Sequence, residues 1–87
     1  MNPISQEVIE ELNSEFTQYF LKFAKDPLDN KTIKVILPVE EIFESFKLTE
    51  QFCNEVTNFL RRKGITVQWH AGRNKFFAYT INFQGRE

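Results

Sequence analysis

The sequence predicts a single α+β domain, residues 1–87, in which three helices pack on a small antiparallel sheet in the order helix-strand-helix-helix-strand-strand. Three observations predict this class. Apolar residues recur every three or four positions in three segments, which is the period of one helix face. Near the end of the chain they alternate with polar residues, which is the period of a strand. The length and the apolar fraction of 41% suit one hydrophobic core.

The first predicted helix covers residues 3–25. Asn2 is a suitable N-cap before Pro3, and Pro27 ends the helix because the residue before a proline is displaced from helical angles. Apolar positions in excess of one face, namely Ile4, Val8, Phe16 and Phe23, could form a homodimer contact through this helix. Its apolar residues at helical spacing are Val8, Ile9, Leu12, Phe16, Tyr19, Phe20 and Phe23.

A turn, "PLDNK", is followed by the predicted strand "TIKVIL" at 32–37, which is short and β-branched. Pro38 suits the first turn of a short helix, 38–46. A third helix covers 49–63, with Thr49 as its N-cap and Gly64 as the residue that closes it. The apolar stripe of this third helix consists of Phe52, Cys53, Val56, Phe59 and Leu60.

A hairpin completes the predicted fold. Apolar and polar residues alternate over 65–70 and again over 77–83, on either side of the turn "AGRNK". The chain contains no internal repeat and no linker long enough to divide it.

Composition argues against several functional classes. The single cysteine, Cys53, excludes an intramolecular disulfide and a multi-cysteine zinc site, and fits a reducing compartment. His70 is the only histidine, so we expect no metal, no cofactor and no enzymatic activity, and a catalytic Cys53–His70 pair is disfavoured because Cys53 lies on the apolar stripe. The acidic first segment is no signal peptide, and no run of about 18 apolar residues exists. We therefore expect a cytoplasmic protein with no membrane contact.

The second half of the chain resembles the winged helix-turn-helix family. The resemblance is carried by Leu48–Thr49 at the start of a helix, by "LRRKGI" at its end, and by the hairpin that follows. It implies that helix 49–63 enters the major groove of duplex DNA and that the hairpin turn is the wing.

The resemblance predicts a DNA-binding surface. Asn, Gln and Arg side chains make paired hydrogen bonds to base edges, and basic side chains bind phosphates. The alternative is that these residues are only the solvated face of a half-buried helix and a soluble turn. The candidate residues are Gln51, Asn54, Asn58, Arg61 and Arg62 on the helix, with Arg73 and Lys75 in the wing.

Charge is divided along the chain. Residues 1–46 carry four Lys against nine acidic residues, a net −5, and residues 47–87 carry seven Lys or Arg against three Glu, a net +4. The leading hypothesis is a regulator that binds duplex DNA. The alternative is a protein-binding module, an inhibitor or adaptor that docks on a larger protein without nucleic-acid contact. Small Phe-rich and Asn-rich domains of this kind resemble phage-encoded proteins that dock on host proteins.

Overall fold

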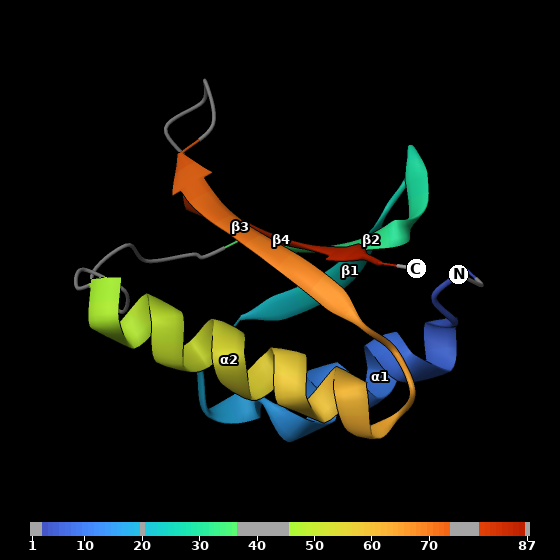
Figure 1. Cartoon of the computed structure of the whole chain (residues 1–87), viewed down its shortest axis with the longest axis horizontal. Helices are drawn as coiled ribbons and strands as arrows, with labels where there is room; N and C mark the ends of the chain where they lie inside the picture. The colour runs from blue at the N-terminus through green and yellow to red at the C-terminus, as the bar shows by residue number, and fades with distance from the viewer. Residues whose placement is uncertain (1–2, 20, 37–45, 74–78, 87) are drawn as a thin grey trace.

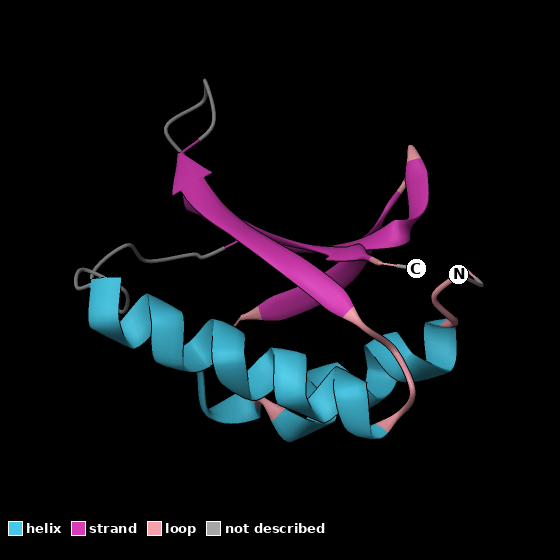
Figure 2. Ribbon diagram, in the orientation of Figure 1, coloured by secondary structure: helices cyan, strands magenta, loops and turns pink. Residues whose placement is uncertain are grey.

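The computed structural model describes residues 3–19, 21–36, 46–73 and 79–86, which form a four-stranded antiparallel sheet with two helices on one of its faces (Figure 1). Figure 2 shows the two layers, with both helices on the same side of the strands. Neither helix of this described part is long and apolar enough to cross a membrane. The elements are α1 (Gln6–Glu15), a 3₁₀ turn (Thr17–Tyr19), β1 (Lys22–Asp26), β2 (Asp29–Ile36), α2 (Phe46–Arg62), β3 (Val67–Arg73) and β4 (Tyr79–Gly85).

The predicted winged-helix order is wrong. The observed order is α-β-β-α-β-β, and the strands lie in the order β1-β2-β4-β3. Each half of the chain contributes a helix followed by a hairpin, and the second strands of the two hairpins, β2 and β4, pair antiparallel at the centre. This arrangement has an approximate two-fold symmetry that the sequence does not reveal, and it leaves β1 and β3 as the two edges.

The helix predicted at 3–25 is much shorter. Ser5 caps α1 by accepting a hydrogen bond from the backbone N–H of Val8 at 3.3 Å. The helix ends at Glu15, and residues 22–26 form β1, which pairs with β2. Proline 27 therefore follows a strand rather than a helix. Aromatic residues at helical spacing misled the prediction, because Phe23 is buried as a strand residue opposite Val35.

The turn between β1 and β2 is held by side-chain carboxylates. Asp26 accepts a hydrogen bond from the N–H of Leu28 at 2.8 Å. Asp29 accepts from the N–H of Lys31 at 3.0 Å and from the hydroxyl of Thr32 at 2.7 Å. These bonds favour the ionised form and lower the pKa of Asp29. The strand predicted at 32–37 is thus β2, which begins three residues earlier.

The predictions for the second half are closer. The helix predicted at 49–63 is α2, although Thr49 is buried inside it and is not its N-cap. Gly64 follows the helix with a φ of 81°, a left-handed conformation that only glycine adopts without strain. The predicted hairpin is β3 and β4. The short helix predicted at 38–46 lies almost wholly outside the described residues.

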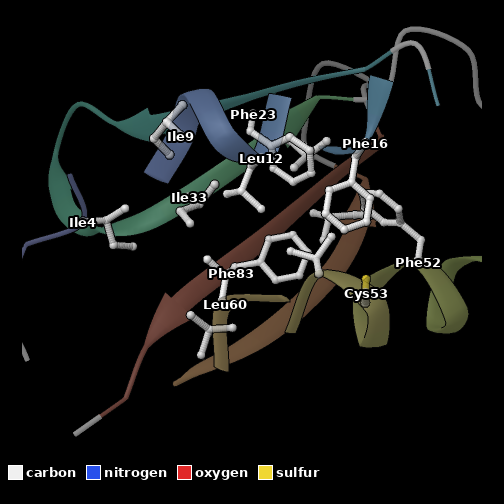
Figure 3. Close-up of a cluster of buried hydrophobic side chains, with 14 residues drawn as sticks. Ile4, Ile9, Leu12, Phe16, Phe23, Ile33, Phe52, Cys53, Leu60 and Phe83 are labelled. Atoms are coloured by element: carbon white, nitrogen blue, oxygen red, sulfur yellow. The ribbon is translucent and has the colours of Figure 1, made fainter. Parts of the chain in front are cut away.

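The core lies between the helices and one face of the sheet (Figure 3). Rings of Phe16, Phe23, Phe52 and Phe83 meet there with centroid separations of 5.8 to 6.5 Å. The opposite face of the sheet carries polar residues, as is common for an antiparallel sheet covered on one side only. Register places Lys34, Asn82 and His70 in one row across that open face.

Candidate functional site

The predicted DNA-binding residues of the helix all lie on the surface of α2. Their side chains are exposed, as the predicted polar stripe requires. These residues are Gln51, Asn54, Asn58, Arg61 and Arg62. The helix itself is not placed as a recognition helix. It lies flat on the sheet beside α1, and its hairpin belongs to the central sheet instead of projecting as a wing (Figure 1).

The predicted wing does not join the basic end of α2. Arg73 ends β3, whereas Arg61 and Arg62 precede its start. Seven strand residues span about 20 Å, so these arginines lie at opposite ends of β3. Lys75 lies outside the described residues. The structure therefore supports no joint action of the helix stripe and the hairpin turn.

The basic end of α2 makes local contacts. The guanidinium carbon of Arg62 and the ammonium nitrogen of Lys63 lie 5.9 and 5.3 Å from the ring centroid of Phe59. Lys63 also forms an ion pair with Glu11 of α1. Two of the three cations at this end are therefore engaged by neighbouring side chains.

Acidic residues flank the same region. A groove of about 240 Å³ between α1 and α2 is lined by Glu15 and Glu55 as well as by Asn58 and Arg62. The hydroxyl of Tyr19 donates to Glu55 at 3.1 Å. Partial burial and this carboxylate raise the pKa of Tyr19. A phosphate backbone approaching this side of α2 would meet carboxylates, which repel it.

Cys53 and His70 lie on opposite sides of the sheet. Cys53 is fully buried on the helix side of the sheet, and burial raises the pKa of its thiol to about 12. His70 pairs with Asn82 in the register of the open face, so the sheet separates it from Cys53. Within the described ranges, no three His, Cys, Asp or Glu residues gather closely enough to bind a metal ion.

At the edge of the sheet formed by β1, a side chain of α1 occupies the outward backbone groups of Phe23. The amide nitrogen of Asn13 donates to the carbonyl of Phe23 at 3.2 Å, and its amide oxygen accepts from the N–H of Phe23 at 2.8 Å. One primary amide thus satisfies both outward backbone groups of Phe23, in the way a neighbouring strand would. Exposed Lys22 and an irregular pairing between Lys25 and Asp26 protect this short edge further.

Among the residues that the structure describes, no strand pairs with the outer edge of β3, which is called the open edge below. The N–H of Arg86 donates to the carbonyl of Thr66 at 2.8 Å, in register with the pairs between β3 and β4. Hydrogen-bonded pairs alternate along an antiparallel ladder, so the N–H and C=O groups of Val67, Trp69 and Ala71 point away from β4. These groups have no hydrogen-bond partner among the residues that the structure describes. The open edge of β3 is the candidate site.

Comparisons with known proteins found no family model, no curated protein and no solved structure that matches this chain. The sequence does not predict the open edge of β3, because residues close to β3 in the chain do not determine whether this strand is central or at an edge of the sheet. Of the apolar residues that predicted a dimer contact on the first helix, Ile4, Phe16 and Phe23 are buried in the core, and Val8 is half-buried against it.

Proposed function

We propose that this protein is a protein-binding module that accepts an extended strand of its partner at the open edge of β3. The observation that carries the proposal is the row of outward backbone groups at Val67, Trp69 and Ala71. An unpaired strand edge is a template for another strand, and main-chain hydrogen bonds then supply much of the affinity.

The side chains of β3 suit such pairing. From Val67 to Gly72 the strand has no charged side chain and no proline, the two devices that commonly block an edge. Val67 is buried and Trp69 is half-buried on the helix side, whereas Gln68 and His70 are exposed on the open face. A bound strand would therefore have an apolar side toward the helices and a polar side toward solvent.

The contrast between the two edges supports this proposal over duplex DNA binding. Asn13 occupies both outward backbone groups of Phe23 in β1, and no corresponding side chain of the described residues occupies those of Val67, Trp69 or Ala71 in β3. The basic end of α2 is engaged with Phe59 and Glu11 and lies beside further carboxylates. At the basic end of α2, Arg61 is thus the one cation of the described residues without such a contact.

Ala71→Pro is the sharpest test. Proline lacks the N–H group, and at position 71 that group points outward, so the change removes an edge donor and no ladder bond within the chain. We expect the wild-type protein, immobilised and exposed to a lysate of cells that produce it, to retain a stoichiometric partner that Ala71→Pro does not retain, whether that partner is another protein or a second copy of this chain. Gln68→Ala, on the open face of the same strand, is the control and should behave as wild type.

A titration with duplex DNA tests the DNA-binding hypothesis in parallel. We expect no binding at low salt, where the phosphate contribution is largest. Salt-sensitive DNA binding that is lost in Arg61→Glu, together with equal protein capture by wild type and Ala71→Pro, would refute strand addition and restore the DNA hypothesis.

A further inference from the structure

We infer that the strand accepted by β3 is β3 of a second copy, which gives a two-fold symmetric homodimer with one continuous eight-stranded sheet. This inference rests on the proposed function of the β3 edge and names its partner. It follows from three features: the position of α2 relative to β3, the charges on one side of α2, and the side chains of β3.

The spacing of strands would bring the two α2 helices into contact. α2 packs against β3, and the ring of its Phe52 contacts that of Phe83 in β4, whereas α1 packs against β1 (Figure 1). Neighbouring strands lie about 4.8 Å apart, so the centres of the two β3–β4 pairs would be separated by about 10 Å. This is the distance at which two helices pack side by side. Pairing of the two β3 edges therefore also brings the α2 helices of the two copies into contact.

One side of α2 faces outward over the β3 edge. The side chains of Glu55, Phe59 and Arg62 face α1, as their shared groove shows, and the buried stripe faces the sheet. The remaining side, opposite α1, carries residues spaced by four, three and four positions, which lie in one row along a helix. This row consists of Glu50, Asn54, Thr57 and Arg61.

The row is complementary to itself. A two-fold axis perpendicular to the sheet makes the paired helices antiparallel, so Glu50 of one copy lies opposite Arg61 of the other, and Asn54 lies opposite Thr57. The symmetry forms the Glu50–Arg61 contact twice. Within the described part of one chain neither Glu50 nor Arg61 has an ion-pair partner. Both charges are thus available to a second copy.

The strand itself tolerates self-pairing. Like charges directly opposite each other destabilise an antiparallel pair, and β3 has no Asp, Glu, Lys or Arg from Val67 to Gly72. Trp69 is half-buried at this edge and would be covered further by the second copy. It is the single tryptophan of the chain, so its fluorescence reports on the interface between the two β3 strands.

Light scattering during gel filtration, over about 1 μM to about 1 mM protein, measures the association. We expect the mass to double with concentration and the Trp69 emission to shift to shorter wavelength in step. Glu50→Arg and Arg61→Glu, which turn two attractions into two repulsions, should each weaken the dimer by about tenfold or more. The double variant Glu50→Arg/Arg61→Glu should restore it. Gln51→Arg, one residue away and outside the row, is the matched control.

Disulfide trapping tests the geometry directly. A mixture of Glu50→Cys and Arg61→Cys should form a cross-linked heterodimer under oxidising conditions. Neither variant alone should cross-link, because two copies of one site would lie about 16 Å apart along antiparallel helices. The native Cys53 is buried and does not compete.

Two outcomes would overturn the inference: a monomer at every concentration, or a dimer that the charge swap weakens and the double swap does not restore. These two outcomes refute the homodimer but do not by themselves refute strand addition at β3. A chain that stays monomeric while wild type, but not Ala71→Pro, retains a different protein would refute the second copy and leave strand addition standing. Failure of both assays would refute both.

Discussion

Replacing Asn13 with alanine tests how the β1 edge is held. The substitution removes two hydrogen bonds, of 2.8 and 3.2 Å, and leaves the N–H and C=O of Phe23 without a protein partner. Each bond contributes about 0.5–1.5 kcal/mol, a total of about 1–3 kcal/mol. Alanine is the better helix former by about 0.6 kcal/mol, which offsets part of the loss. We expect the free energy of unfolding to fall by about 1–2 kcal/mol.

Urea unfolding followed by circular dichroism and by Trp69 fluorescence measures this change. A loss of 1–2 kcal/mol in a domain of this size corresponds to a decrease in Tm of roughly 4–15 °C. Ser14→Ala is the control, since Ser14 is the exposed neighbour of Asn13 on α1 and should retain wild-type stability. Asn13→Ala as stable as Ser14→Ala would show that the amide does not hold the edge, and the contrast drawn between β1 and β3 would then be wrong.

Three further predictions concern the core and α2. Phe16→Ala, which removes the ring that contacts those of Phe23, Phe52 and Phe59, should cost about 3–5 kcal/mol in chemical denaturation, and Phe16→Leu clearly less. Gly64→Ala should cost about 1 kcal/mol by the same measurement, because φ is 81° while no atom obstructs a Cβ. The Cys53 thiol should resist alkylation at pH 8 until the chain unfolds. Its pKa rises from 9.0 to about 12 on folding, so the proton is retained only in the folded state and stability should decrease as pH rises between these values.

Sequence patterns predicted the second half of the fold well because its signals are local. The period of α2, the glycine at position 64 and the alternation in β3 and β4 each depend on neighbours in the chain. The first half failed because its signals are ambiguous. Phe16 and Phe23 fit a helix face by spacing, and what decides between helix and strand is the pairing of Phe23 with Val35, twelve residues away.

The open edge of β3 could not be predicted from local sequence patterns for a related reason. Exposure of Asn54 and Arg61 followed correctly from the helical period, but their role depends on what lies beside α2. Whether β3 has a free edge depends on the strand order β1-β2-β4-β3, which is set by contacts between the two halves. The amide of Asn13 looks like any polar helix residue until β1 is placed next to it.

The Asn13 amide has a consequence for how large an assembly can grow. Two chains joined through β3 would have β1 at both outer edges of the shared sheet, and at both ends Asn13 already occupies Phe23. A third chain would have to displace that amide before it could add. Growth therefore stops at two chains, a closed pair rather than a filament. The same side chain that holds one hairpin to its helix would protect the protein from open-ended polymerisation.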